Sequence, residues 1–114
     1  MEDSSKASVL MKMYDFLKAL IPHINRYPRD QRFILGTRTE TLAIEVLELL
    51  IEAYYLPKEQ KRAKLNEVNL GLEKLRYLLR MSYDLGYCNS IRYGDFAEKL
   101  LEIGRMVGGW LKSV

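Results

Sequence analysis

Four stretches of this chain place apolar residues in alternating steps of four and three, and this spacing limits the possible folds more than any other feature. The stretches cover about residues 8–26, 29–55, 58–86 and 90–112. A repeat of about 3.5 residues keeps one stripe of a helix facing its neighbours in left-handed, nearly antiparallel packing. Because only short connections separate the stretches, the sequence predicts an all-α protein, an up-down antiparallel four-helix bundle.

One line of residues in each stretch is predicted to face the core of the bundle. Thr37 and Glu40 are polar members of the second line. They could form a polar layer that fixes the helix register, or they could line a pocket, and both interpretations stay open. The four lines, in chain order, are Leu10, Tyr14, Leu17, Ile21 and Ile24; Phe33, Thr37, Glu40, Ile44, Leu47, Ile51 and Tyr54; Leu65, Val68, Leu72, Leu75, Leu79 and Ser82; and Tyr93, Phe96, Leu100, Ile103, Val107 and Trp110.

Residues that favour helix ends support the same division of the chain. Pro28 and Pro57 are expected at first helical positions, where a missing N–H is tolerated. Gly86 can adopt the left-handed conformation that ends the third helix. Asn89 or Ser90 can cap the start of the fourth. The predicted helices are therefore joined by short connections.

The length of 114 residues suits one domain, which we expect to cover residues 8–114 after a disordered tail at residues 1–7. Pro22 lies inside the first predicted helix, and because it has no N–H to donate we expect a kink or an early end there. No apolar run approaches the about 18 residues that span a membrane, and the start of the chain lacks the order of a signal peptide. A single cysteine excludes an internal disulfide. We expect a cytoplasmic protein without a membrane partner.

Three of the predicted helices, at residues 29–55, 58–86 and 90–112, carry more apolar residues than one bundle core needs. In residues 29–55 a second apolar line lies about 200° around the helix from the first. Wide stripes could reflect helices that touch two neighbours in a compact bundle, but opposite faces of one helix fit that explanation less well. We therefore predict a homo-oligomer with closed cyclic symmetry. The predicted interface residues are Leu35, Leu42, Val46, Leu49, Ala53, Leu101, Gly104 and Gly108.

The distribution of charge indicates where an anionic partner could bind. Eighteen Lys and Arg against fifteen Asp and Glu give a net charge of +3, and between positions 18 and 38 five basic residues face one acid, Asp30. Arginine holds phosphate oxygens at two points, and tyrosine can stack on an unpaired base. The predicted binding residues are Arg26, Arg29, Arg32, Arg38, Arg76, Tyr77, Arg80 and Arg105. The alternative is a solvated surface with the local ion pairs Glu73–Arg76, Asp84–Arg80 and Glu102–Arg105.

Residues for catalysis or metal binding are scarce. The chain has one histidine, His23, and one cysteine, Cys88. A bundle that binds iron would need Glu-x-x-His pairs, but Leu20 stands three residues before His23. We expect no catalytic residue, no metal and no cofactor, with His23 at the surface or in a cap and Cys88 as an inert loop thiol. A small enzyme built around Glu40 or His23 would require a deep polar pocket that contains both.

Three runs of the sequence resemble the Avd accessory proteins of diversity-generating retroelements, which in turn resemble the four-helix proteins encoded in intervening sequences of bacterial 23S ribosomal RNA genes. The runs are YPRDQRFILG at 27–36, EKLRYLLR at 73–80 and EIGRMVGGWLK at 102–112. The resemblance implies a noncatalytic, basic homo-oligomeric barrel, a pentamer in Avd. It also implies binding to the reverse transcriptase of the retroelement and to RNA and DNA with little sequence preference, in support of mutagenic retrohoming. The alternative is a protein-interaction scaffold of the intervening-sequence type that binds no nucleic acid.

Overall fold

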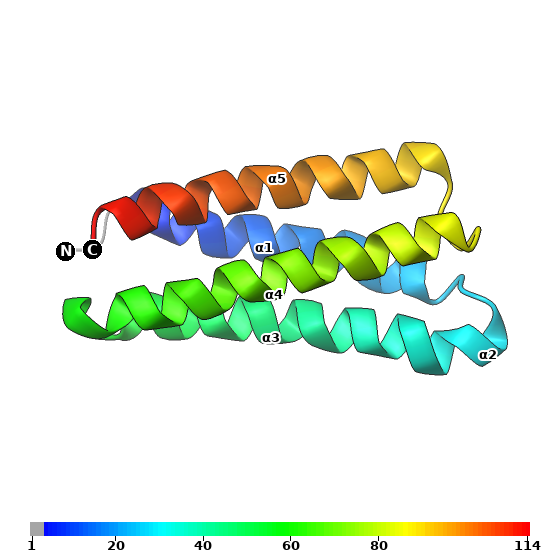
Figure 1. Ribbon diagram of the computed structural model, residues 1–114, viewed down its shortest axis with the longest axis horizontal. Coiled ribbons are helices and arrows are strands. Elements are labelled where there is room, and N and C mark those ends of the chain that lie inside the picture. The colour runs from blue at the N-terminus through cyan, green and yellow to red at the C-terminus, as the bar shows by residue number, and fades with distance from the viewer. Residues whose placement is uncertain (1–3) are drawn as a thin grey trace.

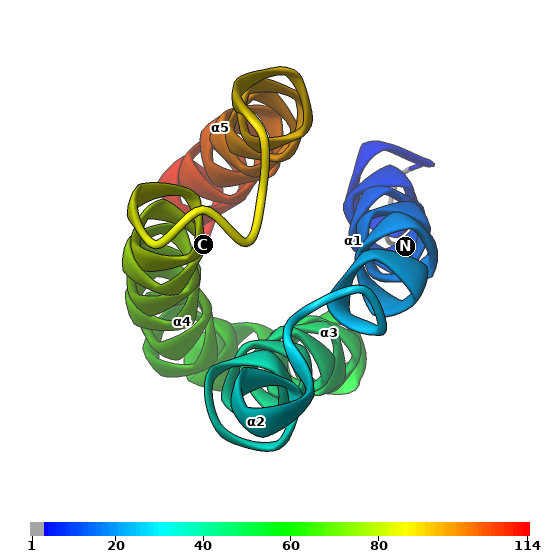
Figure 2. The ribbon, with the colours of Figure 1, turned by 90° about the vertical axis from the view of Figure 1, so that its right-hand side faces the viewer.

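Four long helices run alternately up and down along a bundle of 45 × 23 × 19 Å (Figure 1). The computed structural model describes residues 4–114, and no strand occurs among them. The helical elements are α1 (Ser4–Ile24), α2 (Arg29–Gln31), the π-helical turn η1 (Arg32–Gly36), α3 (Thr37–Tyr55), α4 (Lys58–Asp84) and α5 (Ser90–Lys112). The elements α2, η1 and α3 follow one another directly and form the second long helix. Figure 2 shows the long helices around a common axis in the order α1, α3, α4, α5, as predicted for an up-down bundle.

The ends of α4 and α5 have the capping residues that the sequence predicts. Gly86 has a φ of 85°, in the left-handed region, and the N–H of Tyr87 donates to the carbonyl of Ser82 at 2.8 Å. This pattern closes the last turn of α4. The side chain of Asn89 accepts from the N–H of Arg92 at 2.8 Å and so caps α5. The connection between the two helices is therefore short and specified by its own residues.

The prolines depart from the prediction by small amounts. Pro28 and Pro57 stand one position before the first helical residue, and their carbonyls accept from Gln31 and Gln60 in the following turns. α1 continues through Pro22, which lies on its exposed side, and ends two residues later at Ile24. α1 therefore does not end at Pro22, and beyond the proline the N–H of Asn25 still donates to the carbonyl of Ile21 at 3.3 Å.

The predicted disordered tail is too long. α1 begins at Ser4, so residues 4–7 are helical, while residues 1–3 lie outside the described part of the chain. Val9 is already buried in the core. A helix that starts one turn earlier extends the first turns of α1 without a break, which is consistent with the good helix formers Lys6 and Ala7.

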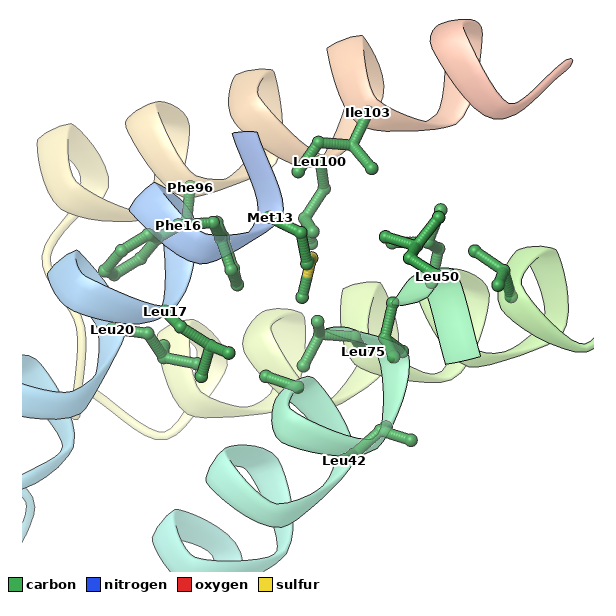
Figure 3. Packing of buried hydrophobic residues seen from close by; sticks show 14 of the residues in the cluster. Met13, Phe16, Leu17, Leu20, Leu42, Leu50, Leu75, Phe96, Leu100 and Ile103 are labelled. Carbon is green, nitrogen blue, oxygen red and sulfur yellow. The ribbon is translucent and has the colours of Figure 1, made fainter. Parts of the chain in front are cut away.

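A single cluster of buried apolar residues runs through all four long helices (Figure 3). The predicted line of α4 is buried throughout, and the predicted line of α5 is buried except for the half-buried Tyr93. Phe16 of α1 and Phe96 of α5 meet edge to face, with ring centroids 5.6 Å apart. These contacts join the first and last helices of the bundle.

The predicted core line of α1 is partly wrong. Tyr14 and Ile21 are exposed, whereas Leu17 and Ile24 are buried as expected. The residues that α1 buries are Val9, Met13, Phe16, Leu17, Leu20 and Ile24. Apart from Leu17, which directly follows Phe16, this set also advances in steps of four and three, so spacing alone could not select it. It removes more apolar surface from water because it includes a phenylalanine and a methionine.

The two faces of α3 are reversed relative to the prediction. Phe33, Ile44 and Ile51 of the predicted core line are exposed, Thr37 is exposed and Glu40 is half-buried, so no polar core layer forms. The line expected at an oligomer interface faces the core of the protomer instead. Of the predicted interface residues, Leu49 is half-buried, and those buried in the core are Leu35, Leu42, Val46 and Ala53.

The close approach of α3 to α4 explains which face of α3 is buried. A Cβ added at Gly71 of α4 would lie 2.7 Å from Cγ2 of Val46. The Val46 face therefore packs on α4 at a position that has no side chain, where a bulkier residue would hold the helices apart. The exposed line of α3 remains apolar. This helix therefore still has two apolar faces, but the predicted core face is at the surface and the predicted interface face is in the core.

Candidate nucleic-acid interface

Four arginines gather around the turn that joins α1 to α3, at the end of the bundle where α2 is labelled in Figure 1. Arg26 follows α1, Arg29 begins α2, Arg32 begins η1 and Arg38 lies in the first turn of α3. We call these residues the corner cluster. Arg26, Arg29 and Arg38 are exposed and Arg32 is half-buried.

The corner cluster is neutralised by few carboxylates. In the described part of the chain, neither Arg26 nor Arg29 forms an ion pair, and Arg38 approaches Glu45 only to 4.0 Å. Arg32 donates to the carbonyl of Asn25 at 3.4 Å. The arginines therefore keep their charge available to an anion in solution, as the shortage of acids between positions 18 and 38 predicts.

The π-helical turn gives this corner an aromatic surface as well. Thr37 donates through Oγ1 to the carbonyl of Arg32 at 2.9 Å within the wide turn. Phe33 is 68% exposed, and the guanidinium of Arg32 lies 5.2 Å from the centre of its ring. Ile34 is exposed beside it. Sequence reasoning placed Phe33 in the core and missed this surface, because no spacing rule signals a π turn.

The predicted binding residues Arg76, Tyr77 and Arg80 lie in the C-terminal third of α4, where the two arginines, unlike most of the corner cluster, pair closely with carboxylates. Arg76 pairs with Glu73 at 3.1 Å, and Arg80 pairs with Asp84 at 3.0 Å, as the local-ion-pair alternative predicts. Hydrogen bonding to Asp84 is the main reason that the pKa of Arg80 is raised. Tyr77 is 70% exposed. We call Arg76, Tyr77 and Arg80 the α4 patch.

The α4 patch borders a groove between α4 and α5. A pocket of about 170 Å³ is lined by Glu73, the three residues of the α4 patch and Tyr93. Arg76 also lines an adjoining pocket of about 350 Å³ together with Leu101, Gly104 and Arg105. The structure thus brings Arg105 to the α4 patch, while the corner cluster lines neither pocket. Glu102 does not pair with Arg105, because it bonds Lys12 of α1 at 2.8 Å.

The part of the predicted interface that belongs to α5 lies at the surface. Leu101 is 47% exposed, and Gly104 and Gly108 are half-buried. A Cβ added at either glycine would meet no atom within 4 Å. This face of α5 is therefore open within the protomer, in contrast to the predicted interface residues of α3.

Two basic residues at the start of α4 serve the fold. Lys61 is buried, and its Nζ donates to the carbonyls of Ala53 and Tyr54 at 2.7 and 2.8 Å. Arg62 donates through Nη2 to the carbonyls of Leu111 and Val114. Both side chains satisfy carbonyls at helix C-termini, where no intrahelical donor remains.

His23 is not at the surface or in a cap, as the sequence suggested. Its side chain is 8% exposed, and its ring centroid lies 5.5 Å from that of Tyr27 and 5.3 Å from that of Phe96. Nε2 is buried and has no hydrogen-bond partner among the described residues. Burial lowers the pKa of His23, and the charges of Arg92 and Arg26 lower it further. Arg92 was not among the predicted binding residues.

The described residues contain no group of three or more potential metal ligands, and none of their helices has the length and apolar character needed to cross a membrane. Cys88 is buried in the connection between α4 and α5, and burial raises the pKa of its thiol. A thiol in that state is a weak nucleophile at neutral pH. His23 and Glu40 share none of the pockets described above.

Comparison with known proteins identifies the family. The family model described as bAvd-like matches residues 8–114. The chain belongs to the bAvd-like family. This bAvd-like match covers all four long helices and confirms the resemblance seen in the three sequence runs. Searches of curated proteins and of solved structures gave no significant match.

Proposed function

We propose that this bAvd-like protein is a noncatalytic accessory protein of a diversity-generating retroelement, which binds nucleic acid and the reverse transcriptase of the element. Membership of the bAvd-like family supports an accessory role. The corner cluster supports nucleic-acid binding, since Arg26 and Arg29 have no carboxylate partner in the described chain and exposed Phe33 lies beside Arg32. Arginines with a stacking aromatic residue are a common means of binding single-stranded nucleic acid.

Self-association is part of the proposal. We expect a cyclic homo-oligomer, with five subunits by analogy to Avd. In this assembly, copies meet through the open face of α5 and the exposed apolar line of α3, which we call the outer line. Ile44 and Ile51 on α3 and Leu101 on α5 are large apolar residues that the protomer leaves exposed. Exposed apolar residues that lie together commonly mark protein contacts. A ring would repeat the net charge of +3 around its axis and strengthen attraction to polyanions.

Charge reversal tests the nucleic-acid site. The double variant Arg29→Glu, Arg32→Glu should bind a labelled single-stranded RNA far more weakly than the wild type in fluorescence anisotropy, with unchanged helix content by circular dichroism. The slope of log affinity against log salt should become shallower by about 1.4, because each of the two lost phosphate contacts contributes about 0.7 to the slope on a single strand. Arg76→Glu with Arg80→Glu should weaken binding less, because those arginines already pair with carboxylates.

A matched control uses a lysine outside both sites. Lys99 lies on α5, where it pairs with Asp95 at 2.7 Å. Lys99→Glu changes the net charge by the same amount as the single variant Arg29→Glu but leaves the corner cluster intact. Equal losses for Lys99→Glu and Arg29→Glu would mean that total charge matters and the corner does not. A wild-type protein that binds no RNA but forms a salt-insensitive complex with protein would favour the scaffold alternative, which the apolar groove between α4 and α5 supports.

A further inference from the structure

We propose that nucleic acid bound at the end of the bundle where α1 ends and α5 begins is coupled to uptake of one proton by His23, so that binding tightens as the pH falls. This inference rests on the proposed nucleic-acid binding and adds a regulation to that site. It depends on the position of His23 behind two arginines of different helices, described next.

The imidazole of His23 is enclosed by aromatic rings. It lies in the last turn of α1, between Tyr27, which follows the helix, and Phe96 of α5 (Figure 3 shows Phe96 at the core). The buried Nε2 has no hydrogen-bond partner in residues 4–114. Burial without an acceptor for the N–H that protonation would create at Nε2 favours the neutral form of the ring.

Two arginines face this ring from separate elements. Arg26 is three residues beyond His23, and Arg92 is four residues before Phe96 and therefore on the same face of α5. Both arginines lower the pKa of His23. The nearby titratable groups Tyr27 and Cys88 are neutral at pH 7, because burial raises the pKa of each. Among the described residues, Arg92 and Arg26 are thus the ones whose charge acts on His23, and both are positive.

Phosphate bound at Arg26 and Arg92 would make the electrostatic potential at His23 less positive. The anion offsets the positive charges that oppose protonation, so the pKa of His23 moves to higher pH in the complex. Linkage makes the effect reciprocal: if bound nucleic acid favours protonated His23, protonated His23 favours bound nucleic acid by the same factor. The affinity should therefore increase as the pH is lowered through the range in which His23 titrates.

The single histidine of the chain makes the proton directly observable. In a wild-type titration followed by NMR, the ring C–H signal of His23 can be assigned without variants. A saturating thymidine oligonucleotide is a suitable probe, because neither thymine nor the phosphodiester changes its charge between about pH 5.5 and about pH 7.5, where histidine titrates. We expect the titration midpoint of His23 to move to higher pH when the oligonucleotide is bound.

The outcomes separate this inference from the proposed function. If the oligonucleotide binds in anisotropy measurements but the His23 midpoint does not move, the coupling is wrong while nucleic-acid binding stands. If the oligonucleotide does not bind at all, the proposed function fails first. A midpoint that moves to lower pH would also overturn the coupling.

Variants of the arginines locate the source of the effect. Arg92→Gln should raise the His23 midpoint in the free protein and reduce the further increase caused by the oligonucleotide. Lys112→Gln, which removes an exposed cation from the last turn of α5 at the opposite end of that helix, should change neither. In His23→Gln, the several-fold tighter binding expected at about pH 5.5 relative to about pH 7.5 should disappear. If Lys112→Gln and Arg92→Gln act alike, the response reflects total charge and the proposed site is wrong.

Discussion

Gly71 is the residue on which the packing of α3 against α4 depends most directly. Its missing side chain lets Val46 approach to a distance at which no Cβ could stand, and Val46 is fully buried. Valine has a stiff side chain, so it cannot turn aside to make room for a methyl group. Glycine in the middle of a long helix costs helix propensity, and here the close packing of two helices offsets that cost.

Gly71→Ala should therefore lower the free energy of unfolding by about 1–3 kcal/mol, the usual cost of overpacking a core. Gly109→Ala is the matched control, because a Cβ at Gly109 meets no atom within 4 Å. It should raise stability by about 0.5–1 kcal/mol through better helix propensity. Urea denaturation of both variants measures the difference. If Gly71→Ala is as stable as Gly109→Ala, the helices are not as closely packed as the structure shows.

His23 should make the stability of the fold depend on pH. Burial first, and then Arg92 and Arg26, lower its pKa in the folded protein below the ordinary value of 6.5. The unfolded chain therefore takes up the proton more readily, and stability falls as the pH drops below about 6.5, down to the pKa of the folded state. Thermal unfolding between about pH 7.5 and about pH 5.5 should show a decreasing melting temperature in the wild type. The decrease should be smaller in His23→Gln, and an equal decrease would place its origin elsewhere.

At the scale of whole elements, the start of α4 stabilises the C-terminus of α3. The buried Lys61 donates to two carbonyls at the C-terminus of α3, and its Nζ lies 5.8 Å from the ring centre of Trp110. A cation at this position bonds carbonyls that have no donor of their own and opposes the negative end of the helix dipole. The basic residues that open α4 thus include structural ones, which charge counting alone cannot recognise.

Replacing this lysine tests the cap. Lys61→Met keeps much of the apolar stem but leaves the carbonyls of Ala53 and Tyr54 without their donor, so we expect a loss of about 1–3 kcal/mol in the free energy of unfolding. Lys64→Met is the comparison, since Lys64 pairs at the surface with Glu52 and Glu67 and such pairs contribute about 0–1 kcal/mol. Chemical denaturation of both variants measures the two losses. Equal losses would show that the carbonyl bonds of Lys61 add nothing beyond surface charge.

The elements differ in how far their burial could be predicted from sequence. In α4 the apolar line stands against a largely polar remainder, so the buried residues were predicted correctly from Leu65 to Ser82. α3 carries two apolar lines with the same spacing, and the choice between them depends on Gly71 of another helix. Spacing describes one helix at a time and holds no information about such a contact.

The candidate site also combines a feature that the sequence predicts with one that it does not. The shortage of acids around Arg29 is a local property of the sequence, and the structure leaves that arginine without a carboxylate in the described chain. The arrangement of His23 between Tyr27 and Phe96 is not local, because it requires α5 to pack beside the end of α1. Residues 23 and 96 carry no pattern that links them, so their contact appeared only in the structure.

At the scale of the whole molecule, the basic residues at the two ends of the bundle have different surroundings. The end formed by the start of α4 and the C-terminus of α5 directs Lys61 and Arg62 to backbone carbonyls. The opposite end presents the corner cluster, where Arg26 and Arg29 have no carboxylate partner in residues 4–114. A net charge of only +3 therefore hides a stronger asymmetry. A polyanion should meet the protein at the end that holds α2.

Because a ring would repeat this basic end around its axis, the oligomeric state is the most informative property of the whole molecule. If copies join through the open face of α5 and the outer line of α3, Leu101→Glu or Ile44→Glu places a charge in an apolar contact and should shift the assembly toward monomers in light scattering at micromolar concentration. Ile91→Glu is the control, because Ile91 is exposed in the first turn of α5, away from both faces. A change of mass in all three variants would point to unfolding, which circular dichroism would detect. If Leu101→Glu and Ile44→Glu keep the wild-type mass, the two faces are not joined, and the corner cluster then acts on nucleic acid without a ring to repeat its charge.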